Sequence, residues 1–445
     1  EAIHASHSWR LTAPMRAVLR RLRGEVPWWP LRLAKAGIPA AAASPHVVAA
    51  VSTESPSAVP AAAPDLSTPL LRPHAGLRAF LVEEFGEVAA ADAVLRIDRF
   101  HLPIVGDEPR GAAKLECSER QAAAWASELA RRTAADSDSP DVSIVIPVYN
   151  QLPFTLACID ALLAHETRYS FEILVGDDAS TDATEAALAV PIPGVRHVRH
   201  AANLGFVRNC NATAQQARGR YVLFLNNDTQ VLPGWLDELV GTLEADAGIG
   251  LAGSKLVYPD GRLQECGAIV WRDGSAWNYG RLADPRRPEF CYLRDVDYVS
   301  GASIALRREL WEELGGFDEL FVPAYAEDAD LAFRVRDRGL RTVVQPLSQL
   351  LHFEGVSSGT DLGSGAKAYQ VENLRKLHAR WAHVLEGHRA NADSHELEKE
   401  RGIIRRVLFV DHCTPTPNED AGSLVALEVM RAFITHGYKV TFIPE

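Results

Sequence analysis

The feature that most constrains this chain is a series of short strand-like runs that alternate with helix-like stretches between residues 141 and 230. The four runs are VSIVIPVY, FEILVGDD, VRHVRH and RYVLFLNND. A short, nearly continuous apolar run such as the first is typical of a strand buried on both faces of a parallel sheet. Strands that alternate with helices form βαβ units, so the sequence predicts an α/β fold with a mostly parallel sheet flanked by helices.

Composition divides the 445 residues into five segments. Residues 1–75 hold a basic segment and an Ala/Pro-rich linker, and residues 76–140 hold helix-like patches that we expect to buttress the next domain. Residues 141–385 form the predicted main α/β domain. Residues 386–403 are charged and are predicted to be a linker. Residues 404–445 have the pattern of one βαβ unit, which is too small to bury a core of its own.

Charge and cysteine usage exclude several function classes. The formal net charge is −12, whereas a general nucleic-acid binder normally presents a basic face. The six cysteines show no zinc-type or CxxC spacing, which is typical of reduced packing residues in a cytoplasmic protein. No apolar run approaches the roughly 20 residues of a membrane-spanning helix, and the first residues lack the apolar core of a signal peptide. We therefore expect a cytoplasmic protein without a nucleic-acid partner.

The N-terminal segment has two interpretations. Residues 1–37 are basic and contain Trp9, Trp28 and Trp29, which is compatible with peripheral contact at an anionic membrane. A solvated helix end, or a helix that docks on a neighbouring domain, accounts for the same residues, and we favour it slightly because three prolines keep any helix short. Since the chain begins with Glu1 and ends directly after a strand-like run, we expect it to be part of a longer polypeptide.

Polar side chains follow two of the predicted strands. Asp177 and Asp178 end the second strand, and Asn226–Asp228 ends the fourth. Ligands of open α/β sheets bind beyond the carboxyl ends of the strands, so these residues are placed for binding. Carboxylates accept hydrogen bonds from a nucleotide base or from ribose hydroxyls. Capping of the next helix by Ser180 or Thr181 explains the polar residues that follow, but not the two acids before them.

Two further sets of residues are candidates for chemistry. Asp228, at the end of an apolar strand, is a good ligand for Mg²⁺ or Mn²⁺, although a simple turn explains it equally well. His352 ends another apolar run and is a second candidate ligand, although a lone histidine is more often a buried core residue. A predicted helix begins with three acids, Glu327, Asp328 and Asp330. Acidic residues in a first turn interact favourably with the helix dipole, but three acids are more than this interaction requires. One of them is therefore a candidate general base.

Taken in order, seven segments resemble glycosyltransferase family 2, whose members have the Rossmann-like GT-A fold. The resemblance implies a mostly parallel mixed sheet flanked by helices. The closest similarity is to the rhamnosyltransferase-like branch, which builds bacterial surface polysaccharides such as O-antigen. The segments are IPVYN at 146–150, VGDDASTDAT at 175–184, NLGF at 203–206, ARGRYVLFLNNDT at 217–229, VSGASIALRRELWEELGGFDE at 299–319, EDADLAFRVRDRG at 327–339 and HFEGVS at 352–357.

The resemblance implies a role for individual residues. Asp328 would be the catalytic base, with Glu327 beside it contacting the acceptor. Asp228 would bind a divalent metal, Mn²⁺ or Mg²⁺, and His352 would help to hold that metal or the diphosphate. The residues implied in nucleotide-sugar binding are Pro147, Tyr149, Asp177, Asp178, Asn203, Gly205, Asn226 and Asn227.

The chain departs from the family pattern at two positions. The family's DXD motif reads Asn226-Asn227-Asp228 here, so its first carboxylate is missing. This change affects the expected contact with the ribose and the expected affinity for the metal. Gln151 stands where the family often has Glu.

Two weaker resemblances flank the domain. Residues 407–423 are similar to the start of a family 4, GT-B type glycosyltransferase, and residues 6–16 resemble a segment that precedes such domains in large multidomain enzymes.

The resemblance implies an inverting, metal-dependent hexosyltransferase. It would move a sugar, with rhamnose as one candidate, from a nucleoside-diphosphate-sugar to a glycan or lipid-linked glycan acceptor. A sugar nucleotidyltransferase would need a Gly-rich basic loop after the first strand, where this chain has YNQLPF. A non-catalytic module that binds nucleotide-sugar or glycan is the alternative from another class, and the incomplete DXD motif favours it.

Overall fold

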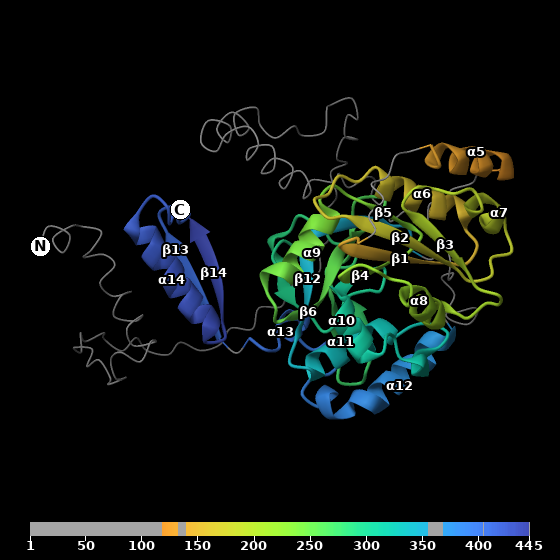
Figure 1. The fold of residues 1–445 in the computed structure, drawn as a ribbon. Coiled ribbons are helices and arrows are strands. Elements are labelled where there is room, and N and C mark those ends of the chain that lie inside the picture. The colour runs from red at the N-terminus through yellow and green to blue at the C-terminus, as the bar shows by residue number, and fades with distance from the viewer. Residues whose placement is uncertain (1–117, 132–138, 355–367, 404, 445) are drawn as a thin grey trace, which may run out of the picture. The chain divides into compact units, whose positions relative to one another are not determined.

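The computed structural model describes residues 118–131, 139–354, 368–403 and 405–444 (Figure 1). The described residues fall into two compact units, one that ends at residue 400 and one that begins at residue 401. The predictions for residues 1–75 and for most of 76–140 lie outside the described residues. Of the predicted buttress, helix α5 (Glu119–Leu129) is described, and its buried face belongs to the core of the larger unit.

The four predicted strands form the parallel half of the main sheet, in the spatial order β3-β2-β1-β4. The strands are β1 (Val142–Val148), β2 (Phe171–Asp177), β3 (Val195–Arg199) and β4 (Tyr221–Leu225). The helices that connect them are α6 (Leu152–Leu163), α7 (Thr184–Leu188) and α8 (Phe206–Ala214). The predicted alternation of strands and helices is therefore confirmed.

The other half of the sheet contains the antiparallel pairs that make it mixed. Strand β11 (Ser303–Arg307) lies between β4 and β6 (Ile249–Val257) and runs antiparallel to both. Strand β12 (Arg341–His352) runs parallel to β6. Three short strands complete the ten strands of the described sheet: β5 (Thr229–Val231), β7 (Leu263–Glu265) and β10 (Arg294–Asp295). The expectation of a mixed α/β sheet is confirmed.

Alternate residues of the strands enter two apolar cores, one on each face of the sheet. On β1, Val145 faces one core, whereas Ile144 and Ile146 face the other, as the two-residue period of a strand requires. Helices α6 and α9 (Trp235–Ala245) cover one face (Figure 1). Helices α8, α10 (Arg308–Leu314), α11 (Glu327–Asp337) and α12 (Ala368–Leu385) contribute to the other core. Two buried faces explain the nearly continuous apolar sequence of these strands.

Residues 386–400, which we predicted to be part of a linker, lie in the larger unit instead. His388 and Glu398 are buried, and the Glu398 side chain accepts a hydrogen bond from the Arg389 amide at 3.1 Å. The short helix α13 (His395–Glu398) belongs to this segment. The charged composition misled the prediction because charged side chains can be buried when they are paired.

The remaining elements are small. Strands β8 (Ala268–Val270) and β9 (Ala276–Asn278) form a hairpin, and two single-turn helices are η1 (Pro288–Phe290) and η2 (Glu319–Phe321). In the smaller unit, β13 (Arg405–Asp411) and β14 (Tyr438–Pro444) pair in parallel and are joined by α14 (Ala421–Thr435), which confirms the predicted βαβ unit. The described helices include none with the length and apolar character needed to cross a bilayer.

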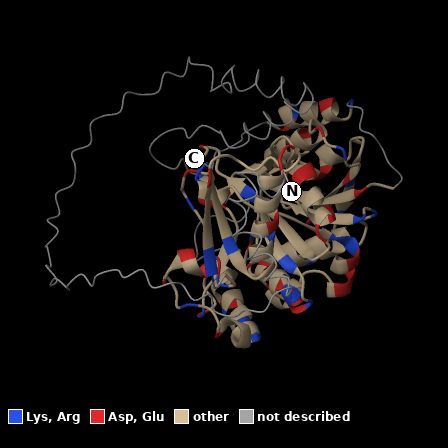
Figure 2. Ribbon diagram, turned by 90° about the vertical axis from the view of Figure 1, so that its left-hand side faces the viewer, with Lys and Arg blue, Asp and Glu red and all other residues tan. Residues whose placement is uncertain are grey.

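Basic and acidic residues are interspersed along the elements seen in Figure 2. Several form ion pairs between elements that are distant in sequence. Arg341 lies 2.9 Å from Asp246 and 2.6 Å from Asp295, and Arg220 lies 2.8 Å from Asp141. Such exposed pairs contribute little stability individually, so the two apolar cores hold the unit together.

Candidate active site

The predicted site residues at β1 and β2 lie at the carboxyl edge of the sheet. The parallel register places Pro147 beside Gly176 and Val148 beside Asp177. Pro147 is buried, whereas the side chain of Tyr149 is 44% exposed just beyond the strand. An exposed aromatic ring at this edge of the sheet is available to stack on a planar group such as a nucleotide base.

Asp177 is fully buried and both of its carboxylate oxygens are engaged within the protein. Oδ1 accepts a hydrogen bond from the Ser180 amide at 2.9 Å, and Oδ2 lies 3.1 Å from His197 Nε2 and 2.5 Å from Arg199 Nη1. Burial alone would raise the pKa of Asp177, but the hydrogen bonds from His197, Ser180 and Arg199 outweigh it and hold the pKa well below its usual range. Asp177 is thus a charged anchor for the loop that follows β2.

Asp178 brings the predicted 203–205 segment to the same edge. Its carboxylate accepts hydrogen bonds from the amides of Leu204 at 2.7 Å and Gly205 at 2.9 Å. Burial raises the pKa of Asp178 in spite of these two bonds. Asn203 is exposed, and its side-chain oxygen accepts a hydrogen bond from the Gly205 amide at 3.1 Å. Three of the predicted residues are therefore joined by direct contacts.

Gly205 cannot be replaced without strain, for two reasons. Its φ of +78° lies in the region that favours glycine. A Cβ atom at this position would also lie 2.8 Å from Cβ of Pro323, which is closer than real Cβ contacts.

The prediction that Ser180 or Thr181 caps the following helix is wrong. Helix α7 begins after Ala183, which makes no side-chain capping bond. Ser180 Oγ instead accepts a hydrogen bond from the Asn150 amide at 2.8 Å, and the Thr181 amide donates to Asn150 Oδ1 at 2.7 Å. These polar residues therefore tie the loop after β1 to the loop after β2.

The turn after β4 places Asp228 against His352. Strand β5 pairs antiparallel with the end of β12, so that Thr229 is opposite His352. As a result, His352 Nε2 lies 3.2 Å from Asp228 Oδ1, and both residues are buried. Burial lowers the pKa of His352, but the adjacent Asp228 carboxylate outweighs burial and raises it. The two metal ligands implied by the resemblance are thus in contact.

Asn226 and Asn227 support this turn. Asn226 donates its amide hydrogen to the Ala302 carbonyl at 3.0 Å and accepts a bond from Thr229 Oγ1 at 2.7 Å through its own carbonyl. The buried Asn227 side chain donates to Thr155 Oγ1 on α6 at 3.0 Å. The Asn227 side chain is thereby tied to the protein interior.

Asp228 and His352 have the chemistry of ligands for a divalent cation. Within the described ranges, no group of three or more His, Cys, Asp or Glu side chains is arranged to hold a metal. A Mg²⁺-type ion needs few protein ligands, because it keeps water and takes phosphate oxygens from the substrate. A carboxylate oxygen and an imidazole nitrogen 3.2 Å apart are suitable ligands for Mn²⁺ as well.

Helix α11 presents Asp328 at the same edge. Asp328 is partly buried; its Oδ2 accepts a hydrogen bond from the Gly301 amide at 3.1 Å, and its Oδ1 accepts one from the Ala329 amide at 2.7 Å. Burial raises its pKa in spite of these bonds. A fixed carboxylate whose pKa is raised is well suited to act as a general base.

The other two acids of this helix have different surroundings. Glu327 is 5% exposed, and its Oε2 has no hydrogen-bond partner. Burial, followed by the charge of Asp328, raises the pKa of Glu327 well above its usual range. Asp330 is fully buried and binds Arg334 at 2.7 Å and the Trp381 indole at 2.9 Å, so its role is to fix α12 against α11.

Sequence reasoning missed two residues of strand β7. Gln264 Oε1 lies 3.0 Å from His352 Nδ1, and Glu265 accepts a hydrogen bond from the Ser300 amide at 3.0 Å. Burial raises the pKa of Glu265 to about 8. The sequence signal was weak: the Asp260-Gly261 pair indicates a turn before this segment, but a three-residue strand has too few positions to show a period.

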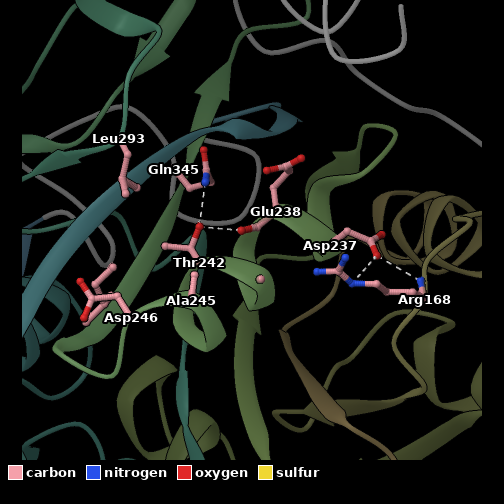
Figure 3. Close-up of a pocket in the computed structure, with 10 residues that line it drawn as sticks. Arg168, Asp237, Glu238, Thr242, Ala245, Asp246, Leu293 and Gln345 are labelled. Atoms are coloured by element: carbon pink, nitrogen blue, oxygen red, sulfur yellow. Dashed lines mark hydrogen bonds and ion pairs between the residues drawn. The ribbon is translucent and has the colours of Figure 1, made fainter. Parts of the chain in front are cut away.

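A cavity of about 360 Å³ lies elsewhere, beside the amino end of β6 (Figure 3). Arg168 and Asp237 face each other at one side, and Thr242 contacts Gln345 at 2.7 Å. None of the predicted site residues lines it. Because β6 runs parallel to β4, this cavity lies at the opposite edge of the sheet from Asp228 and Asp328.

We predict that Asp177→Asn destabilises the protein most near neutral pH. The low pKa of the folded-state Asp177 contributes stability above the unfolded-state pKa near 4, and this contribution is lost as pH falls toward the folded-state pKa. Urea denaturation should show the gap between wild type and variant narrowing by about 1.4 kcal/mol per pH unit below pH ~4. Glu386→Gln, at an exposed position, is the control. A gap that does not change with pH would contradict this interpretation of Asp177.

The sequence matches the family model for Glycosyl transferase family 2 over residues 143–314 and that for Glycosyl transferase family 21 over residues 291–384. The second match lies outside residues 407–423, whose resemblance to family 4 stays a prediction. The solved structures that resemble this chain include that of GalNAc-T7 with UDP, GalNAc and Mn²⁺. The two are 17% identical with a TM-score of 0.44, and the match covers 63% of this chain and 60% of that chain.

Among curated relatives, the O-antigen biosynthesis protein RfbC of Myxococcus xanthus is 36% identical over 50% of this chain and 18% of its own length. The N-acetylglucosaminyl-diphospho-decaprenol L-rhamnosyltransferase of Mycobacterium tuberculosis is 27% identical over 50% of this chain and 80% of its own. The chain therefore spans less than a fifth of one of these relatives. The matched region contains β1, β2, β4 and the turn that bears Asp228. Residues 143–314 are therefore similar to glycosyl transferase family 2 domains.

Proposed function

We propose that the domain transfers a sugar from a nucleoside-diphosphate-sugar to an acceptor hydroxyl, with inversion at the anomeric carbon and with help from a divalent metal. The observation that carries the proposal is that one turn supports both halves of the site. Gly301 donates its amide hydrogen to Asp328 at 3.1 Å, and the next residue, Ala302, accepts the amide hydrogen of Asn226 at 3.0 Å. The proposed base and the proposed metal turn are therefore two hydrogen bonds apart.

Asp328 is proposed to remove the proton from the acceptor hydroxyl. The amides of Gly301 and Ala329 hold its carboxylate in a fixed orientation, and its raised pKa favours proton uptake. The acceptor oxygen forms a bond to the anomeric carbon while the bond from that carbon to the diphosphate breaks, which inverts the configuration. A divalent metal supplies charge that stabilises the leaving diphosphate, and Asp228 and His352 would hold it.

The remaining predicted residues are proposed to bind the donor. Tyr149 and Pro147 would line the base pocket, and Asp177 and Asp178 would support it through the loops that they anchor. Glu327 is proposed to contact the acceptor, as the family resemblance implies, although its carboxyl is 5% exposed. The other residues proposed to shape the donor site are Asn203, Gly205, Asn226 and Asn227.

The names of the relatives suggest the class of acceptor. One is named for O-antigen biosynthesis, one for succinoglycan biosynthesis, and one for rhamnosyl transfer to a diphospho-decaprenol-linked sugar. We therefore propose a glycan or lipid-linked glycan acceptor in bacterial surface-polysaccharide synthesis, with rhamnose as a candidate sugar. An acceptor of this kind implies that the enzyme works at the cytoplasmic face of the membrane as a peripheral protein.

The proposed function can be tested with a panel of UDP-, TDP- and GDP-sugars. We expect Mn²⁺-dependent binding of one donor and slow release of its nucleoside diphosphate in the absence of acceptor. A correctly folded protein that binds no donor, with or without Mn²⁺, would contradict the proposal. It would favour a non-catalytic module, since the missing acid at Asn226 is the one departure that points to that alternative.

We predict that Asp328→Asn binds donor normally but loses transfer by about 10²–10⁴-fold. Asparagine keeps the size of the side chain and the oxygen that accepts from Gly301, but it cannot take up a proton. Donor affinity by calorimetry and turnover by nucleoside diphosphate release separate the two effects. Asp337→Asn, at the exposed end of the same helix, is the matched control. Near-normal turnover of Asp328→Asn would contradict its assignment as the base.

A further inference from the structure

Strand β7 carries two buried polar side chains that the proposed chemistry does not use. Gln264 is 3% exposed and Glu265 is 1% exposed. The strand pairs antiparallel with β6, with Glu265 opposite Leu256, and it lies in the middle of the chain segment between β6 and β11. Polar groups are costly to bury unless their hydrogen bonds are specific, so the partners of these two residues indicate their purpose.

Gln264 contacts the outer nitrogen of the proposed metal ligand. Its Oε1 lies 3.0 Å from His352 Nδ1, while His352 Nε2 points to Asp228 at 3.2 Å. An amide oxygen can only accept a hydrogen bond, so Nδ1 must carry the hydrogen. In the neutral imidazole this leaves the lone pair on Nε2, which is the nitrogen that faces Asp228.

Glu265 contacts the turn that supports the proposed base. Its Oε1 accepts a hydrogen bond from the Ser300 amide at 3.0 Å. The next amide along the chain, that of Gly301, donates to Asp328 at 3.1 Å. Glu265 therefore fixes Ser300, and the neighbouring residue Gly301 holds Asp328. Within the described residues, no hydrogen bond joins Glu265 directly to Asp328.

We propose that Gln264 and Glu265 are paired positioning residues, one for each half of the active site. Gln264 selects the His352 tautomer that presents Nε2 to a divalent cation, and Glu265 holds the Ser300–Gly301 turn in the position that orients Asp328. Because the residues are adjacent on one strand, β7 sets the separation between metal and base. This inference rests on the proposed function of the same site.

The role of Gln264 is tested by titrating Mn²⁺ into the protein in the presence of UDP and measuring the heat of binding by calorimetry. Gln264→Met keeps the length of the side chain but removes the acceptor, and should weaken Mn²⁺ binding by about 10–100-fold. Gln264→Glu keeps an acceptor oxygen and should bind at least as tightly as wild type. Wild-type affinity in the Met variant, or equal loss in both variants, would overturn the proposal. This readout does not depend on turnover, so it holds even if no donor is transferred.

The Glu265 half is tested by turnover at saturating Mn²⁺ and donor. Glu265→Gln keeps the oxygen that accepts from Ser300 and should stay close to wild type. Glu265→Met should lower kcat by about 10–100-fold with the Mn²⁺ affinity unchanged. If the Met variant does not fold, as judged by near-ultraviolet circular dichroism, the Gln variant decides alone. A tenfold loss in the Gln variant, or normal kcat in a folded Met variant, would overturn the assignment.

Failure of this inference and failure of the proposed function give different results. A wild-type protein that transfers no sugar would contradict the proposed function alone, and the Mn²⁺ titration would still decide the role of Gln264. A wild-type protein that transfers sugar, with both Met variants unaffected, would contradict only the positioning role of β7.

Discussion

The site depends on the hydrogen bond between the Asn226 amide and the Ala302 carbonyl at 3.0 Å, which fastens the turn before β11 to the turn after β4. Strand β11 runs antiparallel to β4 with Ser303 opposite Leu225, so the beginning of β11 meets the end of β4. Residues 300–302 therefore lie at the carboxyl edge of the sheet. A parallel β11 would place this turn at the opposite edge, away from Asp228. The mixed topology is thus a requirement of the site.

A second constraint is the number of acidic groups that are buried close together. Asp177 is kept ionised by Arg199 and His197, whereas burial raises the pKa of Glu265, Glu327 and Asp328. The charge of Asp328 also disfavours the ionisation of Glu265 and Glu327. A region of this kind is most stable when a cation shares it or when some of its carboxyls stay protonated.

The sequence predicts the strands and helices of the parallel half well because β1, β2 and β4 are almost wholly buried and therefore read as nearly continuous apolar runs. Through the family resemblance it also assigns Asp178 and Gly205 to the donor pocket and Asp228 and His352 to the metal site, and the structure places the members of each pair in contact. It does not predict β7, whose three residues show no period, nor the contacts of Gln264 and Glu265, which join residues 88 and 35 positions apart. Such contacts depend on tertiary packing that no local pattern encodes.

Two local predictions failed for the same physical reason. Ser180 and Thr181 have the composition of helix caps, but the neighbouring loop offers Asn150 as a stronger partner. Residues 386–400 have the composition of a linker, but Glu398 and His388 find partners that make their burial favourable. In both cases tertiary hydrogen bonds, which the local sequence does not reveal, decided the outcome.

The most direct test of the account is to locate Mn²⁺ by anomalous scattering in crystals grown with a nucleoside diphosphate. The account predicts one manganese peak about 2 Å from both an Asp228 carboxylate oxygen and His352 Nε2, with diphosphate oxygens as further ligands. A nucleoside diphosphate bound at this edge with manganese held by other residues, or with none, would contradict it.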